Sequence, residues 1–162
     1  MNQREKLENL IGISFNDYPG SDYIPTEVSI PDYSRHPRFY FEKKLKEPLC
    51  GLFYTVKIIA FEYEFHKNIV FEVPDFRLTH LSLLENLLEQ LSEILGADKN
   101  RLLHLAEREY EELQQDSWQG RLWNFPDYED MVDVMLNFNL NRGLSLTIFE
   151  PVNLFDEEEE ED

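Results

Sequence analysis

Apolar residues cluster in three stretches of the chain whose composition predicts β-strands. The predicted strands are residues 38–44, 52–65 and 69–73, which are rich in aromatic and β-branched side chains. Between the first helix and the first strand, prolines interrupt any regular pattern. We therefore expect a sheet that begins after a proline-rich loop.

The longest predicted strand, residues 52–65, changes its apolar face partway along. Two sets of side chains lie on opposite faces: Tyr54, Val56, Ile58 and Ala60 on one, and Phe61, Tyr63 and Phe65 on the other. A bulge near Ile59, or a strand buried on both faces, would explain the change.

Apolar residues at helical spacing predict three helices. The first lies within the first dozen residues and ends near Gly12. The second contains a capping box, Ser82 with Glu85, and a stripe of leucines that ends at Gly96. Asp98 can cap a third helix that carries Leu102, Leu103, Ala106, Tyr110 and Leu113. The short turn between the last two predicts an antiparallel helical hairpin.

Residues 131–140 fit two patterns. A helix would align the apolar side chains of Met131, Val132, Met135 and Leu136. A strand would align every second residue from 132 to 140, and the asparagines in this stretch are poor helix formers. The following Asn-Arg-Gly at 141–143 can form a three-residue hairpin loop with a glycine at positive φ. We therefore predict a β-hairpin.

Together these elements predict an α+β fold, an antiparallel β-sheet with an α-helical hairpin packed on one face. A chain of 162 residues can bury a core as one domain, which we place at residues 1–155. Residues 156–162 are all acidic and predict a disordered acidic C-terminal tail.

The chain is strongly acidic, with 33 acidic and 15 basic residues and a net charge of −18. Without the tail, the chain still has 26 acidic and 15 basic residues. The negative electrostatic field of such a chain disfavours direct binding to nucleic acid or to a membrane surface, and favours a basic protein partner. One cysteine excludes an intrachain disulfide, and the charged N-terminus does not resemble a signal peptide. We expect a cytoplasmic protein, a monomer or weak dimer.

Three patterns could carry chemistry. Glu62, Glu64 and His66 share one face of a strand and could bind a metal or act as acid and base, although a solvated sheet face is the simpler interpretation. A second set lies at helical spacing, where a solvated helix face is favoured: His104, Glu107 and Glu111.

The third candidate is Cys50, which has no neighbouring base and is expected to pack as a small apolar residue. No phosphate loop, nucleotide fingerprint or metalloprotease motif is present. We predict no cofactor, no resident metal and no enzymatic activity.

An aspartate precedes a tyrosine four times along the chain: Asp17-Tyr18, Asp22-Tyr23, Asp32-Tyr33 and Asp127-Tyr128. Near the fourth pair the sequence adds aromatic and acidic residues: Trp118, Trp123, Glu129 and Asp130. Tyrosine supplies rigid contact area, and aspartate accepts charge-assisted hydrogen bonds from Arg or Lys. The alternative is that the tyrosines cover the edge of the core and the aspartates stabilise turns. We hypothesise that the twelve residues gather into one surface that binds a cationic partner.

With these pairs and the C-terminal sequence Phe-Asp-Glu-Glu-Glu-Glu-Glu-Asp, the chain resembles in overall type the small acidic bacterial immunity proteins that neutralise nuclease toxins. These include the immunity proteins of contact-dependent growth inhibition systems. The resemblance implies a cytoplasmic inhibitor without turnover, whose acids occupy the positions that the toxin's basic groups use for phosphate. Two alternatives remain: a nucleic-acid mimic that blocks a DNA-handling enzyme, and a small metal-dependent enzyme using Glu62, Glu64 and His66.

Overall fold

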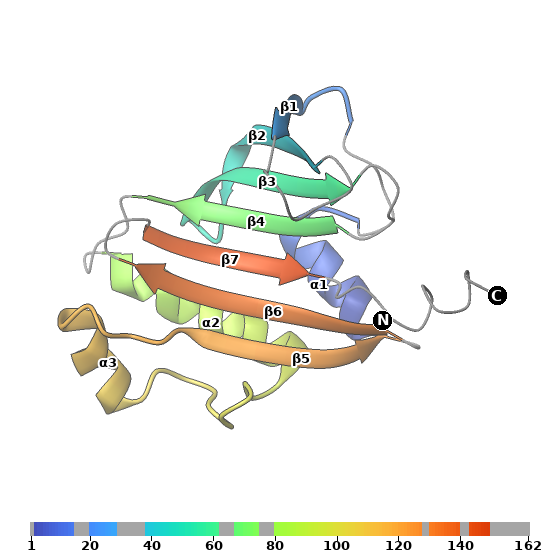
Figure 1. Ribbon diagram of the computed structural model, residues 1–162. Coiled ribbons are helices and arrows are strands. Elements are labelled where there is room, and N and C mark those ends of the chain that lie inside the picture. The colour runs from blue at the N-terminus through green and yellow to red at the C-terminus, as the bar shows by residue number, and fades with distance from the viewer. Residues whose placement is uncertain are drawn as a thin grey trace.

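Over the residues that it describes, the computed structural model contains one seven-stranded antiparallel sheet and three helices, which confirms the α+β class (Figure 1). It describes the following residues: 2–14, 20–28, 38–61, 67–74, 80–127, 130–139 and 143–149. The described elements pack around one hydrophobic core. The predicted acidic tail lies outside the described residues.

The sheet consists of two meanders joined at a central seam. The first meander is β1 (Ile24–Val28), β2 (Arg38–Leu49), β3 (Phe53–Phe61) and β4 (Lys67–Val73). The second is β5 (Arg121–Asp127), β6 (Asp130–Asn139) and β7 (Gly143–Phe149). Strand β7 pairs with β4, which gives the order β1-β2-β3-β4-β7-β6-β5. The first and fifth strands therefore form opposite edges of the sheet.

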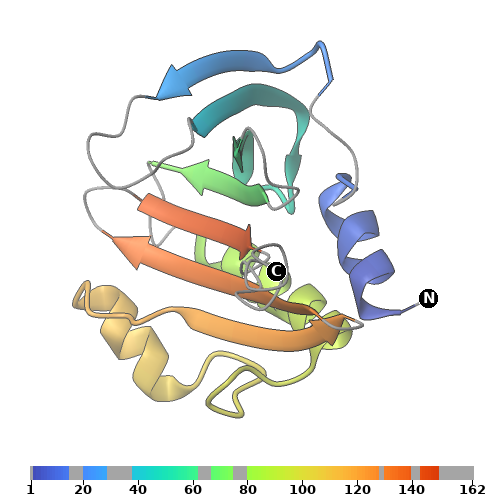
Figure 2. The same ribbon diagram turned by 45° about the vertical axis from the view of Figure 1, so that its right-hand side comes forward.

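Helices α1 (Gln3–Ile11) and α2 (Leu81–Leu95) lie together on one face of the sheet (Figures 1 and 2). Helix α3 (Glu107–Gln114) lies beside the β5 edge. As predicted, α1 ends at Gly12, which has φ 73° and donates its N–H to the Glu8 carbonyl at 2.8 Å. The predicted end of α2 at Gly96 is also confirmed.

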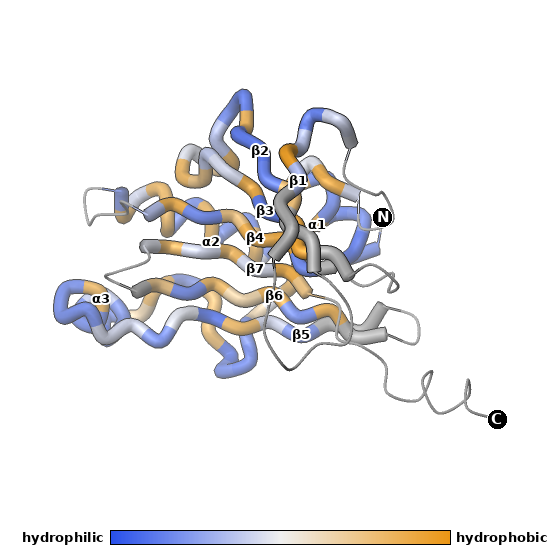
Figure 3. The backbone as a smooth tube through the Cα atoms, turned by 45° about the horizontal axis from the view of Figure 1, so that its top comes forward, coloured by the Kyte–Doolittle hydropathy of each residue, from blue (hydrophilic) through white to orange (hydrophobic). Residues whose placement is uncertain are grey.

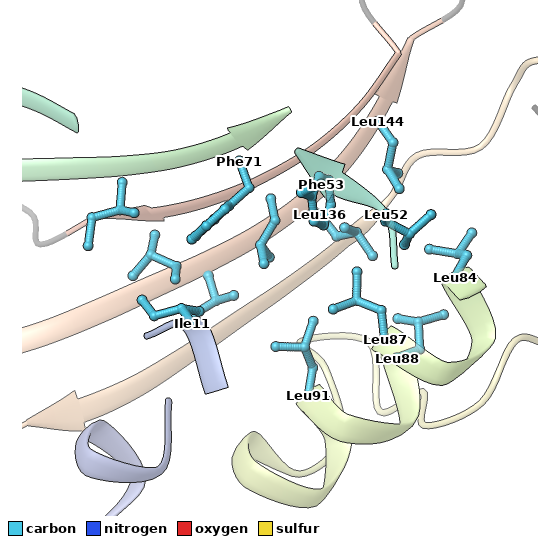
Figure 4. Packing of buried hydrophobic residues seen from close by; sticks show 14 of the residues in the cluster. Ile11, Leu52, Phe53, Phe71, Leu84, Leu87, Leu88, Leu91, Leu136 and Leu144 are labelled. Carbon is cyan, nitrogen blue, oxygen red and sulfur yellow. The ribbon is translucent and has the colours of Figure 1, made fainter. Parts of the chain in front are cut away.

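The core fills the space between the helices and the sheet. Figure 4 shows the leucine stripe of α2 directed at the sheet, and its members are fully buried: Leu84, Leu87, Leu88 and Leu91. Burial of each such side chain is worth roughly 2 kcal/mol relative to exposure. Hydrophobic residues follow one another in parts of β3 and β4 (Figure 3), and the members that face the core are buried, whereas Ile59 and Val70 are partly exposed on the other face.

The predicted hairpin after residue 130 is confirmed, because Asn139 pairs with Gly143 across β6 and β7. Gly143 has φ 81°, and a Cβ there would lie 2.0 Å from the carbonyl oxygen of Val73. The glycine is therefore required both by the turn and by close approach to β4, and the sequence indicated only the turn. Residues 140–142 of the loop lie outside the described residues.

Two predictions about the helices are wrong. Ser82 does not cap α2, which already begins at Leu81, and no side chain caps its first turn. The third helix begins at Glu107 rather than after Asp98, because the Asp98 carboxylate accepts the backbone N–H groups of Asn100 and Leu102 and stabilises a local turn instead. Helices α2 and α3 are thus joined by an irregular connection, and α3 is short.

The bulge predicted near Ile59 is also misplaced. The irregularity lies in the partner strand β2, between Lys44 and Leu49. Opposite it, Phe53 is buried while Tyr54 is 57% exposed, so β3 changes face at its start. The side chains on which the predicted change of face rested, Phe61, Tyr63 and Phe65, are not described. Strand β5 was not predicted at all.

Candidate binding surfaces

Asp22 and Tyr23 form the Asp-Tyr pair that the structure describes most fully. The Asp22 carboxylate accepts a hydrogen bond of 2.9 Å from the ammonium group of Lys43, on the neighbouring strand β2. The same Nζ lies 4.9 Å from the centroid of the Tyr23 ring. A carboxylate and a ring face thus hold one cation, which is the chemistry predicted for a partner, but the cation belongs to the same chain.

The pKa values of this group follow from its geometry. The hydrogen bond from Lys43 lowers the pKa of Asp22, and the bond to Asp22 raises the pKa of Lys43. Burial raises the pKa of Tyr23, an effect that the nearby ammonium group opposes. At neutral pH the carboxylate and the ammonium group are both ionised. Asp22 is therefore already engaged and is a poor candidate for the main contact with a partner.

Trp118 and Trp123 lie in the core and not on the surface. Their side chains are 4% and 2% exposed. The Trp123 indole donates to the Gly96 carbonyl at 3.2 Å, and the Trp118 indole donates to Glu109 at 2.8 Å. Each indole fills space between β5 and the helical layer while its N–H finds a partner, as buried tryptophans require. The structure therefore gives both residues a packing role in place of the predicted exposed anchors.

Arg121 and Glu109 form a buried ion pair that the sequence did not reveal. The guanidinium Nε donates to Oε2 at 2.9 Å and Nη2 donates to Oε1 at 2.6 Å, a bidentate arrangement. Arg121 and Glu109 are 3% and 6% exposed. The remaining acceptor capacity of the carboxylate is used by the Trp118 indole and by the Ala106 backbone N–H. The buried charges are thus paired and hydrogen-bonded, which burial demands.

The same arginine fixes the irregular connection before α3. Its Nη1 and Nη2 groups donate to the carbonyl oxygens of Leu103 and His104 at 3.2 and 2.9 Å. The Asp98 carboxylate lies 3.9 Å from Nε. On the other side, the Lys99 N–H donates to the Leu122 carbonyl of β5 at 2.7 Å. The network therefore holds residues 97–106 against the edge of the sheet, and its role is structural.

Opposing effects set the pKa of Glu109. Burial raises it, but the hydrogen bonds from Arg121, Ala106 and Trp118 outweigh burial and hold the pKa below its ordinary value. The group is ionised at neutral pH. Nothing in the local sequence pointed from Glu109 to Arg121, twelve residues later.

The remaining predicted site residues are only partly described. Asp127 pairs with Asp130 at the end of the β5–β6 hairpin, and their side chains are not described. Six residues lie outside the described residues: Asp17, Tyr18, Asp32, Tyr33, Tyr128 and Glu129. Asp22 lies at the β1 edge and Asp127 at the β5 edge, six strand spacings or roughly 29 Å apart. The described members of the predicted surface therefore do not gather in one place.

The candidate metal residues receive no support from the described geometry. Glu62, Glu64 and His66 lie outside the described residues. His104 precedes α3, so its predicted helical spacing to Glu107 does not form. Within the described ranges, no group of three or more His, Cys, Asp or Glu side chains is placed to hold a metal ion.

Cys50 sits in the turn between β2 and β3 with φ 52°. It is half-buried and packs against the core, close to the predicted apolar role. Burial raises the pKa of its thiol, which favours the unreactive protonated form.

Exposed acids are concentrated on the helices next to β5. Glu85, Glu89 and Glu93 recur every fourth residue on the exposed side of α2. On α3, Glu107 and Glu111 are exposed at the same spacing. A hydrogen bond between the Tyr110 hydroxyl and Glu85 joins the two helices, and burial together with this carboxylate raises the pKa of the tyrosine. The two helices therefore present acids on adjoining surfaces.

Charge also separates the two meanders of the sheet. Strands β1 to β4 contain six basic residues against four acidic ones; the basic residues are Arg38, Lys43, Lys44, Lys46, Lys57 and Lys67. Strands β5 to β7 contain three aspartates and a single base, the buried Arg121. A cationic partner would therefore meet less repulsion at the second meander than at the first.

In the described residues, no helix is both long and apolar enough to cross a membrane. Comparison of the chain with protein-family models, with curated proteins and with solved structures finds no match.

Proposed function

We propose that this protein is a non-catalytic binding protein that neutralises a cationic protein partner, of the nuclease-toxin type, as an immunity protein does. The observation that carries the proposal is the exposed acid surface of α2 and α3, in a chain of net charge −18. These acids recur on one side of each helix and leave that surface strongly negative. A toxin that binds phosphate must present the opposite charge.

Neutralisation of this kind requires occlusion and no turnover. The acids of α2 and α3 attract the basic surface of the toxin and increase the association rate by electrostatic steering. The bound protein then fills the space that the nucleic-acid substrate would occupy. Asp22 contributes little to this attraction, because Lys43 already neutralises it.

The first test is affinity capture from whole cultures of the source organism, at low and at high salt, with mass spectrometry of the retained proteins. We expect one dominant basic protein that survives moderate salt and loses a nuclease activity on binding. A diffuse set of basic proteins that salt removes would identify only a polyanion and would contradict the proposal.

A pair of charge variants tests where the attraction originates. The test variant neutralises three acids of α2, as Glu85→Gln, Glu89→Gln and Glu93→Gln. The control variant neutralises three exposed acids elsewhere, as Glu5→Gln, Glu42→Gln and Glu47→Gln. Both variants have the same net charge. At low salt we expect the α2 variant to slow association with the captured partner by about tenfold, and the control to slow it much less. If the two variants slowed association equally, net charge alone would set the association rate, and the position of the acids on α2 would not.

A second candidate is a nucleic-acid mimic that inhibits a DNA-handling enzyme. It is favoured by the regular spacing along α2, where Glu85, Glu89 and Glu93 follow one another at about 6 Å. A mimic should lose affinity in similar steps as each acid is removed, because every neutralised phosphate position counts. Occlusion of a toxin should concentrate the loss in a few anchor residues. Single glutamine variants along α2 and α3 separate the two functions.

A further inference from the structure

Residues 97–117 lie between α2 and β5 and contain α3, and we call them the α3 arm. The arm lies beside the β5 edge, away from the middle of the sheet (Figures 1 and 2). Its buried side chains are mostly charged: Asp98, Glu109 and Leu113. The buried side of α2, by contrast, consists of four leucines. Polar contacts therefore contribute more to holding the arm than to holding α2.

The polar contacts of the arm with the sheet converge on Arg121 and Leu122, at the start of β5. Arg121 bonds Glu109 and two carbonyl groups of the connection before α3. The Lys99 N–H donates to the Leu122 carbonyl at 2.7 Å. Because these contacts meet at two successive residues, weakening the bond between Arg121 and Glu109 would loosen the arm as a whole.

The position of the arm against β5 leaves one buried oxygen atom without a hydrogen bond. The Asp98 Oδ2 atom finds no donor among the described residues. It lies 3.9 Å from Arg121 Nε, which donates to Glu109 instead. Two carboxylates thus share one guanidinium group. A buried polar atom without a partner costs free energy, and water would satisfy it if the arm opened.

Strained backbone occurs near both ends of the arm. Arg101, in the turn that Asp98 stabilises, has φ 64°, and Asp116, directly after α3, has φ 57°. A positive φ is unfavourable for residues with a side chain, so surrounding contacts must hold it. Residues at the ends of an element can absorb a change of backbone angles when a segment moves. Arg101 and Asp116 are therefore placed to act as hinges.

We propose that the α3 arm is an acid-sensitive latch, which opens from β5 as one unit while the sheet and α2 stay folded. Ionised Glu109 keeps the latch closed through its two hydrogen bonds with Arg121. Opening uncovers the backbone edge of β5, because the Lys99 N–H then leaves the Leu122 carbonyl. This inference is independent of the function proposed above.

Charged and titratable groups approach Glu109 from each neighbouring element: Arg121 from β5, Asp98 from the connection, Arg108, Tyr110 and Glu112 from its own helix, and Glu85 of α2 through Tyr110. Burial raises the pKa of Glu109, but hydrogen bonds from Arg121, Ala106 and Trp118 outweigh burial and lower it. Ionised Glu109 therefore favours the closed arm. The opening constant should rise as the pH falls through the folded pKa, on the acid side of the ordinary glutamate range.

Native-state amide hydrogen exchange of the full chain, followed by NMR at several urea concentrations, tests whether the arm opens as a unit. The reporters are the amides of Lys99, Leu102 and Ala106 in the arm, and of Ile58 and Ile69 in the sheet. We expect the arm amides to share one opening constant, at least about tenfold larger than that of the sheet amides, with a weaker urea dependence. Arm amides with the same constant and the same urea dependence as the sheet amides would overturn the proposal.

Two variants separate opening of the arm from global unfolding. Ile69→Val changes the core of β4, three strands from β5, and destabilises the closed and open forms alike. It should raise the opening constant of the sheet amides by about fivefold and leave that of the arm unchanged. Glu109→Gln should raise the opening constant of the arm at neutral pH by about tenfold, and the exposed control Glu107→Gln should not. If Ile69→Val accelerated both sets equally, the arm would open only by global unfolding, and the proposal would be wrong.

An acid titration tests the role of Glu109 as the trigger. The two indole groups are matched reporters, because Trp118 donates to Glu109 and Trp123 donates to Gly96. As the pH falls, the arm amides should exchange with a larger opening constant and the Trp118 indole signal should shift, while the Trp123 signal changes little. Glu109→Gln should abolish this rise of the opening constant. A rise that persists in Glu109→Gln would mean that another carboxylate opens the arm, and would overturn the role of Glu109.

Discussion

The two meanders of the sheet use charged residues in opposite ways. In the first meander the ion pairs are exposed: Lys43 with Asp22, and Lys57 with Glu72, whose side chains are each 36% exposed. In the second meander the pair is buried, with Arg121 bonded to Glu109 and fully removed from water. An exposed pair gains little because water screens it, whereas a buried pair cannot lose one partner without leaving an isolated charge. In this acidic chain, the contribution of a basic residue to stability therefore depends on whether its ion pair is buried, and the number of basic residues does not determine it.

Replacing Arg121 should have the largest effect on stability. Arg121→Ala leaves the Glu109 carboxylate buried without its cation and releases the carbonyl groups of Leu103 and His104. We expect the free energy of unfolding to fall by about 3–5 kcal/mol in chemical denaturation. The matched control is Lys57→Ala in the first meander, which should cost about 0–1 kcal/mol. Similar losses for the two variants would contradict the distinction between the meanders.

The seam between the meanders should be the next most sensitive site. Gly143→Ala combines an unfavourable positive φ with a Cβ that would lie 2.0 Å from the Val73 carbonyl oxygen. We expect a loss of about 2–4 kcal/mol in thermal or chemical unfolding. Gly12 is the control, because it has φ 73° and no atom within 4 Å of an added Cβ. Gly12→Ala should therefore cost only about 1 kcal/mol.

The buried pair should also make stability depend on pH. The pKa of Glu109 is lowered in the folded chain, so its ionised form contributes stability that is complete above the pKa of the unfolded chain. This contribution is lost as the pH falls through the folded pKa, on the acid side of the ordinary glutamate range. Glu109→Gln should lower stability at neutral pH by about 1–3 kcal/mol and flatten its decline in acid.

The control for this prediction is Glu107→Gln, which changes an exposed acid on the same helix. It should leave stability at neutral pH nearly unchanged. If stability declines with falling pH as steeply in Glu109→Gln as in the unmodified chain, then other carboxylates cause the pH dependence. Urea unfolding at a series of pH values measures both variants.

The sequence predicted those elements of the fold in which a regular repeat of apolar residues sets the buried face. The alternation in residues 132–140 predicted β6, and the leucine spacing predicted the buried side of α2, because a single period decides which face is apolar. Contacts between distant residues were not predictable in this way. Arg121 reaches Glu109 across the loop, and no local pattern specifies such a partner. The Asp98 turn is local, but an aspartate at that position is suited equally to a helix cap and to a turn. Strand β5 was missed for the same reason, since its inward residues include an arginine.

The same distinction between local patterns and contacts of distant residues applies to the candidate site. Asp22 and Tyr23 hold the ammonium group of Lys43, and binding of a partner's cation by an Asp-Tyr pair stays a prediction. The internal contact could not be predicted, because the pairing of β1 with β2 is what brings Lys43 there. The aromatic character of Trp118 and Trp123 suggested anchors, but aromatic residues are equally suited to a core. Only their burial decides between these roles.

The smallest expected effect concerns the Asp-Tyr pair itself. Lys43→Gln removes the cation that lies over the Tyr23 ring and bonds to Asp22. The pKa of Tyr23, already raised by burial, should rise further, because Lys43 opposes that rise. The pKa of Asp22 should move back up toward its ordinary value, since its main hydrogen bond is lost. NMR titration of the Tyr23 ring and the Asp22 carboxyl carbon measures both shifts.

The control for this variant is Lys43→Arg, which keeps the positive charge over the ring and should leave both pKa values nearly unchanged. The same variant connects the pair to partner binding. If Asp22 is occupied only by Lys43, then Lys43→Gln frees a carboxylate beside an aromatic ring at the β1 edge, and the chain should bind an added peptide with Lys on one helical side and Leu on the other, at a weak site near Tyr23. If NMR shows no new peptide-dependent shifts at Tyr23, an Asp-Tyr pair is insufficient to recruit a cation from another molecule, and the internal lysine is held by strand pairing.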